Sequence, residues 1–198
     1  FPEALAEQIA AAAAALEDFP TDAPLLCAMG NLMRRRDRVD LARRSFEAAL
    51  THGAVEPRTW HSTEVFDVAA VCLSSCLEQE TGVEGARRVL EEALEERPYA
   101  NRVRRRLIEL EIGEGREEEA VALLDGMLCT DEERESLEAI IRGACRLKDG
   151  DGAAAVGHLQ PVYVGGCVDP WCFRWFVRTL VAANKVEAAA EVAGRWGT

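Results

Sequence analysis

The 198-residue chain has little basic charge, few aromatic rings and no long uninterrupted apolar segment. Its net charge of −12 argues against nucleic acid or an anionic membrane surface as the main partner, because both attract basic faces. No stretch approaches the roughly 20 apolar residues of a membrane-spanning helix, so we expect no membrane insertion. Proline accounts for only 7 residues and 48% of the chain is hydrophobic, which excludes a disordered chain.

Histidine is also scarce, and the motifs of common catalytic sites are absent. The three histidines are at positions 52, 61 and 158. The sequence has no Gly-rich phosphate loop and no H-E-x-x-H, G-x-S-x-G or Cys/His nucleophile signature. His61, Glu64 and a cysteine could be combined into a catalytic site, but their spacing in the sequence does not favour this over ordinary surface polar residues. We therefore expect no catalytic residues, no cofactor and no enzymatic activity in this chain.

The seven cysteines do not form a disulfide framework. Their number is odd and most lie in apolar helical patterns, where a free thiol packs as a small hydrophobe. Free thiols imply a reducing compartment, which predicts a cytoplasmic protein. Two pairs suggest a metal site, Cys72 with Cys76 and Cys167 with Cys172. Neither pair has the C-x-x-C spacing of zinc sites or a nearby histidine, so we expect no bound metal.

The acidic charge is concentrated in the middle of the chain. The net charge is −2 over residues 1–60, −12 over residues 61–140 and +2 over residues 141–198. Arginine supplies 21 of the 23 basic residues. Several charges fall at predicted helix ends, where they complement the helix dipole. Arginines cluster at several places in this acidic chain. The net charge of −12 therefore does not exclude a partner with acidic groups.

What the chain has in abundance is alanine, and it comes in a repeated pattern. Its 32 alanines favour helix and let helices approach closely. Gly30 is followed 12 residues later by Ala42, and Phe46 and Ala49 come after it. The second half of this pattern recurs at Ala86, 34 residues later at Ala120, and more weakly at Ala155 and Ala189, again 34 residues apart. A fixed period of this length indicates a helical repeat protein.

Each period is predicted to form two antiparallel helices. Apolar stripes at helical spacing, with turn signals between them, predict helices over residues 3–18, 22–36, 38–51, 61–80, 83–96, 99–113, 116–128, 131–147, 151–163, 169–183 and 185–196. The hairpins span residues 22–51, 61–98, 99–129, 131–163 and 169–196, behind a leading helix within residues 1–21. We expect a single all-α repeat domain over residues 1–198, and the chain looks like a fragment of a longer protein.

The spacing of Gly30, Ala42, Phe46 and Ala49, the 34-residue period and the closing Pro98 resemble the tetratricopeptide repeat family. The resemblance implies an α-α superhelix, in which hairpins stack as a right-handed solenoid and their first helices line a concave groove. It also implies a scaffold that binds a peptide or a partner domain. An alternative is an accessory or oligomerisation domain of a larger enzyme, such as a transferase.

Register places five candidate peptide-binding residues in that groove: Asn31, Arg34, Arg102, Arg105 and Arg106. Some members of the family clamp a C-terminal carboxylate, and Asn31, Arg102 and Arg106 match positions of that clamp. Cys27 and Cys72 stand where the clamp needs a lysine and an asparagine. Independently of the family, Arg102 and Arg106 share a helical face and could bind a carboxylate or phosphate. The competing interpretation is that they pair with neighbouring glutamates such as Glu95, Glu96 or Glu109.

Large aromatic rings are concentrated near the end of the chain. Trp171 and Trp175 lie one helical turn apart, and Trp196 is close to the terminus. They either pack the last hairpin or form an interface for a partner, for the parent protein or for a second copy of the chain. A homo-oligomer is therefore a further candidate arrangement.

Overall fold

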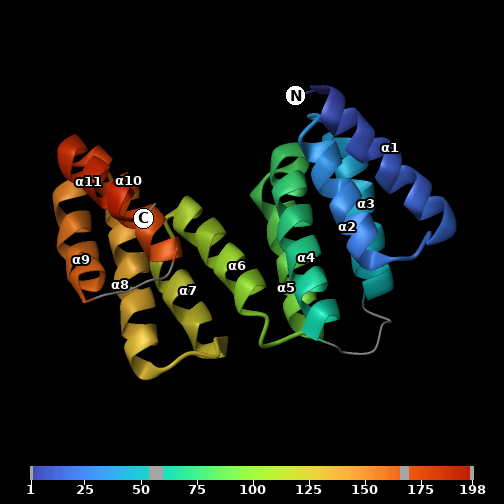
Figure 1. Cartoon of the computed structure of the whole chain (residues 1–198). Coiled ribbons are helices and arrows are strands. Elements are labelled where there is room, and N and C mark those ends of the chain that lie inside the picture. Colours follow the sequence, from blue (N-terminus) through green and yellow to red (C-terminus); the bar gives the residue numbers. More distant parts are fainter. Residues whose placement is uncertain (1, 54–59, 166–169, 197–198) are drawn as a thin grey trace. The chain divides into compact units, whose positions relative to one another are not determined.

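A computed structural model of the chain describes residues 2–53, 60–165 and 170–196, with the side chains of residues 2, 60–63, 195 and 196 excepted (Figure 1). Throughout these residues the regular secondary structure is helical. The helices are α1 (Pro2–Asp18), α2 (Ala23–Arg34), α3 (Val39–Gly53), α4 (Trp60–Thr81), α5 (Val83–Glu96), α6 (Asn101–Glu114), α7 (Glu117–Ala122), the 3-10 helix η1 (Leu123–Gly126), α8 (Asp131–Lys148), α9 (Gly152–Val164), α10 (Pro170–Ala182) and α11 (Val186–Trp196). The all-α prediction is confirmed.

The helix ends follow local capping rules. Asp22 caps α2 by accepting a hydrogen bond from the Leu25 amide at 2.8 Å, and Pro24 lies within the first turn. Thr130 opens α8 with a complete capping box, in which its hydroxyl accepts from the Glu133 amide and the Glu133 carboxylate accepts from the Thr130 amide. These ends agree with the predicted ones within about two residues, the scatter expected of helix termini.

One predicted helix is partly wrong. The pattern predicts a helix over residues 116–128, whereas α7 stops at Ala122, η1 continues to Gly126 and Met127 is extended. The tighter 3-10 turn buries Leu124 completely and leaves Met127 only 8% exposed. Packing of these two side chains thus overrides the α-helical period in the last turn.

The chain divides into two compact units, Phe1–Arg106 and Leu107–Thr198, and the boundary falls within α6. In the first unit α2 pairs with α3 and α4 with α5, while α1 packs on α2 and α2 also contacts α4. Its core includes Phe46, which is fully buried, together with Leu73 and Cys76. The hairpins of this unit therefore bury their apolar faces against their neighbours in chain order.

The second unit is built in the same way. The α8–α9 hairpin is its centre, α7 contacts α8, α10 contacts both α8 and α9, and α11 packs on α10. Ile108 and Ile112 of α6 belong to its core, which also contains Ile140, Leu159 and Phe176. The contacts within each unit join α2 to α3, α4 to α5, α8 to α9 and α10 to α11. The five hairpins with their bounds, and the assignment of residues 1–198 to one domain, remain predictions.

The predicted close helix crossing is present at Gly30. A Cβ atom at this position would lie 2.6 Å from the Phe46 ring, so only glycine fits between α2 and α3. Gly143 has the same role in the second unit, since a Cβ there would lie 2.8 Å from the Leu159 side chain. Gly143 precedes Ala155 by 12 residues, as Gly30 precedes Ala42.

Candidate functional site

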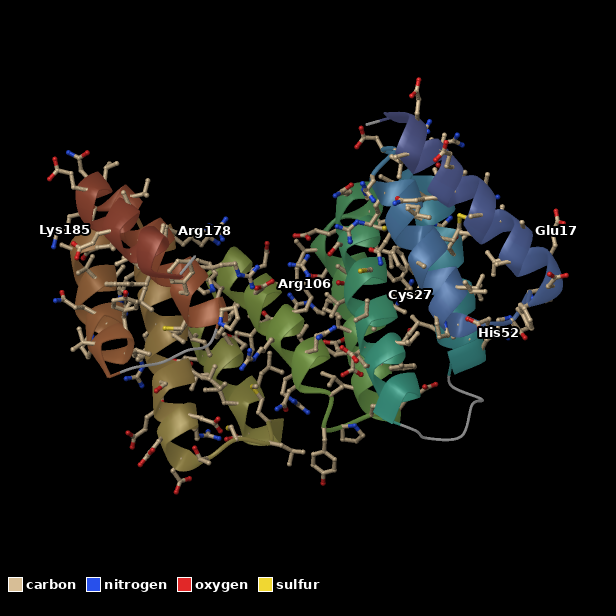
Figure 2. All side chains as sticks on the ribbon, viewed as in Figure 1. Glu17, Cys27, His52, Arg106, Arg178 and Lys185 are labelled. Carbon is tan, nitrogen blue, oxygen red and sulfur yellow. The ribbon has the colours of Figure 1, made fainter. Side chains whose placement is uncertain are left out.

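All five groove candidates lie in the first unit, on α2 and α6. Side chains of α4 contact four of them, Asn31, Arg34, Arg102 and Arg106. We define the α2–α4–α6 face by Asn31 and Arg34 on α2, Cys72 on α4, and Arg102 and Arg106 on α6. Helix α2 contacts α4, and Cys27 lies in the core between them (Figure 2). Cys27, Asn31 and Arg34 share one side of α2 because they are four and three residues apart.

Cys72 is the point at which the α2 side chains meet α4. The Arg34 guanidinium donates to the Cys72 sulfur at 3.4 Å, and the Cys72 thiol lies 3.8 Å from the Asn31 amide oxygen, which accepts from it. Asn31 and Arg34 are exposed, whereas Cys72 is half-buried. Burial raises the pKa of the Cys72 thiol, and the nearby Arg34 charge opposes that shift. The thiol is therefore neutral at physiological pH and acts as a weak hydrogen-bonding group.

The α6 arginines of the face are held by carboxylates of α4. Arg106 pairs with Glu78 and donates through Nε to the Ser74 hydroxyl at 3.4 Å. Arg102 lies 3.8 Å from the Glu64 carboxylate. The competing interpretation is that neighbouring glutamates such as Glu95, Glu96 or Glu109 neutralise these arginines. The carboxylates found beside them are instead Glu64 and Glu78 of α4. Sequence reasoning missed Glu64 and Glu78 because both are distant from α6 in the chain.

A second group of charges surrounds the start of α6. The Arg97 guanidinium stacks over the Phe66 ring at 4.2 Å from its centroid. Burial raises the pKa of Asp67, while the charges of Arg97 and Arg102 lower it. Arg104 donates to the Pro98 carbonyl at 2.5 Å, and Arg105 is half-buried. The Arg97 contact joins the α5–α6 connection to α4, and the Arg104 contact joins this connection to the first turn of α6.

The terminal tryptophans have different surroundings. Trp171 is 3% exposed, and its indole Nε1 donates to Glu109 Oε1 at 2.9 Å. Trp175 is half-buried, with the Arg178 guanidinium 5.2 Å from its ring centroid. The side chain of Trp196 lies outside the described residues. An interface at these three residues remains a prediction, and Trp175 is the more accessible of the two described rings.

The remaining expectations concern metals, membranes and catalysis. Among the described residues, no three His, Cys, Asp or Glu side chains gather in a way that could hold a metal ion. None of the described helices combines the length and apolarity needed to cross a bilayer. The six described cysteines are free thiols. The side chain of His61 lies outside the described part, as do Cys167 and the loop around Pro57.

The comparisons with known proteins concern the fold. No protein-family model matches the chain, and no curated protein matches its sequence. A tetratricopeptide repeat protein from Parabacteroides merdae ATCC 43184 has a similar solved structure, with a TM-score of 0.48 and 16% identity. The similarity covers 98% of this chain and 86% of that chain. The stacked hairpins and the residue pattern make this chain tetratricopeptide-repeat-like.

Proposed function

We propose that the chain is a non-catalytic scaffold that binds a peptide or a partner domain on the α2–α4–α6 face. The observation that carries the proposal is the convergence of hydrogen-bonding side chains from three helices of one compact unit. Asn31 and Arg34 come from α2, Cys72 from α4, and Arg102 and Arg106 from α6, with contacts at 3.4 Å and 3.8 Å linking α2 to α4.

The chemistry of this face favours a partner with carboxylate groups. Guanidinium and amide donors pair with carboxylates, and a guanidinium can do so through two parallel hydrogen bonds. Acidic side chains and a C-terminal carboxylate both supply such a group. Arg102 and Arg106 would exchange Glu64 and Glu78 for the partner's carboxylate, so their contribution is reduced by the ion pairs already present.

The proposal is tested by screening the chain against a displayed random peptide library. We expect binders that are lost when Arg34, Arg102 and Arg106 are changed together to glutamine. The control is Arg88→Gln on α5, an exposed arginine 3.8 Å from Glu92 and outside the face. The absence of any binder sensitive to the triple change but insensitive to Arg88→Gln would contradict the proposal.

The alternative function is an accessory or oligomerisation domain of a larger enzyme, such as a transferase. The half-buried Trp175 ring, covered on one side by Arg178, is the observation in its favour, because interfaces are enriched in tryptophan and arginine. Light scattering at several protein concentrations tests self-association. A monomer at every concentration would eliminate the homo-oligomer.

For either function we propose the cytoplasm as the location, because the chain is rich in free thiols.

A further inference from the structure

The second unit contains a cavity between α9, α10 and α11, which we call the α9–α11 cavity. Its volume is about 280 Å³. Its apolar lining includes Tyr163, Phe176, Leu180 and Val192. The rings of Tyr163 and Phe176 stack with their centroids 4.8 Å apart, and Phe176 and Leu180 are each 4% exposed. The cavity is therefore a preformed apolar site that the proposed function does not use.

The size of this cavity and its exposed rim favour one large side chain as the occupant. Cavities of roughly 150 Å³ hold a benzene ring, whereas sites for whole small molecules take about 300–1,000 Å³. Gln160, Val164 and Lys185 line the rim and are exposed, so the cavity is open to solvent. An aromatic side chain that projects from another protein surface can enter from this side.

The rim of the cavity also carries a cation with no partner among the described residues. The Lys185 ammonium, labelled in Figure 2, forms no ion pair or side-chain hydrogen bond with any of them. Glu191 lines the cavity as well, but it comes six residues later, roughly 9 Å further along the helix axis. The Lys185 end of the cavity therefore favours an occupant with a carboxylate beside its apolar group.

The first unit presents a side chain with this chemistry. Phe19 follows the end of α1 and is 61% exposed. Glu17 and Asp18 directly precede it, are exposed, and form no ion pair or side-chain hydrogen bond with the described residues. The other strongly exposed ring of the described chain, Tyr99, follows Arg97 and thus has a cation as its near neighbour. Phe19 is therefore the exposed ring that carboxylates accompany.

The backbone around Phe19 is held in place before any contact forms. The Phe19 amide donates to the Ala15 carbonyl at 2.9 Å, and the Phe19 carbonyl accepts from the Asp22 amide at 3.2 Å. Pro20 follows with a fixed φ. A ring presented on an ordered segment loses little conformational entropy on binding, which favours its insertion into a cavity.

We propose that two copies of the chain associate head to tail, with Phe19 of one protomer in the α9–α11 cavity of its partner. Asp18 or Glu17 then lies beside Lys185. The contact joins two different surfaces, so each protomer keeps one surface free for a further copy. It involves neither the α2–α4–α6 face nor Trp175 and is separate from the proposed function. A contact built on one anchor is small, so the association is weak and needs high protein concentration.

The test is sedimentation velocity of the whole chain over a range of concentrations, under reducing conditions and at low ionic strength. Phe19→Ser removes the ring, and Ala188→Trp fills the cavity from a half-buried position of its lining. Tyr99→Ser is the matched control, because it removes an equally exposed ring that has no neighbouring carboxylate. Thermal unfolding followed by circular dichroism establishes that each variant is folded.

We expect the unmodified chain to associate, and Phe19→Ser and Ala188→Trp each to weaken the association about tenfold or more. Tyr99→Ser should change it by less than about twofold. An equimolar mixture of Phe19→Ser and Ala188→Trp should form dimers and nothing larger, since each variant supplies the surface that the other lacks. A chain that is monomeric at every concentration, association that survives Phe19→Ser, or a mixture that stays monomeric would overturn the proposal.

Charge reversal gives a second measurement that does not depend on filling the cavity. Lys185→Glu alone should weaken the association severalfold, and the combined variant Glu17→Lys/Asp18→Lys/Lys185→Glu should restore it. Failure of the combined variant to regain association would contradict the pairing. Association that depends on Trp175 but not on Phe19 would overturn the proposal and support the tryptophan interface. A monomeric chain that binds a peptide of residues 15–22 would place the occupant on another protein and overturn the second-copy contact.

Discussion

At the scale of single residues, the contact of Gly30 with Phe46 sets the distance between α2 and α3. A methyl group at Gly30 would approach three ring atoms of Phe46 at 2.6–2.9 Å. Gly30→Ala is therefore expected to destabilise the protein by about 1–3 kcal/mol, the usual cost of overpacking a core. Urea denaturation measures this change.

Gly157→Ala is the matched control, because Gly157 is an exposed α9 residue whose Cβ would meet nothing within 4 Å. There the substitution should stabilise the protein by about 0.5–1 kcal/mol through helix propensity. Equal effects of the two substitutions would show that the α2–α3 crossing is not tightly packed.

The hydroxyl of Thr179 is buried without a hydrogen-bond partner among the described residues, and the residue is 0% exposed. A buried polar group without a partner costs free energy, and valine has nearly the same shape. Thr179→Val is expected to raise the free energy of unfolding by about 1 kcal/mol. A loss of stability in a denaturant titration would mean that this hydroxyl has a partner in solution.

The buried thiols predict a decline of stability at alkaline pH. Burial, with a smaller contribution from nearby Cys72, raises the pKa of Cys27 from 9.0 to about 11. Burial, with contributions from Glu117 and Asp149, raises that of Cys145 to about 11 as well. The unfolded chain releases these protons near pH 9, so their contribution is complete below pH 9 and is lost as the pH rises toward 11.

The measurement is the urea midpoint under reducing conditions at neutral and alkaline pH. The Cys27→Ala/Cys145→Ala variant should start from a lower stability, because its core has lost two sulfur atoms, but should decline less between pH 9 and 11. Parallel pH profiles of the two proteins would contradict this account.

At the scale of the elements, the capping box of α8 holds the start of the central helix of the second unit. Thr130→Val removes the cap acceptor of the Glu133 amide and should cost about 1 kcal/mol. The same substitution at Thr51, an exposed residue of α3 whose hydroxyl donates to the Glu47 carbonyl, should change stability by less than about 0.5 kcal/mol. Equal losses at both positions would show that the capping box contributes nothing specific.

The helices also show which structural features local sequence patterns can predict. In the described part of the chain, the helices other than the end of α7 follow from apolar stripes, turn signals and capping residues, all of which act within one or two helical turns. The exception, the change from α7 to η1, depends on burying Leu124 and Met127 in the same core as α8. That core is assembled from segments distant in the chain, so the change has no local signal.

At the scale of the whole molecule, the two compact units predict separate local stabilities. In a repeat protein each hairpin is stabilised mainly by its neighbours in the chain. Leu90→Ala removes a fully buried side chain of the first unit and should cost about 2–5 kcal/mol. Amide hydrogen exchange should then accelerate in α3, α4 and α5 while α8, α9 and α10 remain protected.

Ile140→Ala in the second unit is the reciprocal variant, since Ile140 is also fully buried. It should accelerate exchange in α8–α10 and leave α3–α5 protected. A uniform acceleration along the chain in either variant would mean that residues 1–198 unfold as one cooperative domain.

The sequence by itself determined the helices, apart from the end of α7, and the close crossing at Gly30, because each depends on spacing along a short piece of chain. It also placed Asn31 and Arg34 on one helix, and Arg102 and Arg106 on another. Only the tertiary structure decided which of these charges are compensated. Arg106 meets Glu78 and Arg102 meets Glu64, whereas Arg34 meets the Cys72 thiol 38 residues away in the chain. Ion pairing depends on distances of a few ångströms between helices, and those distances are set by packing that no local pattern encodes.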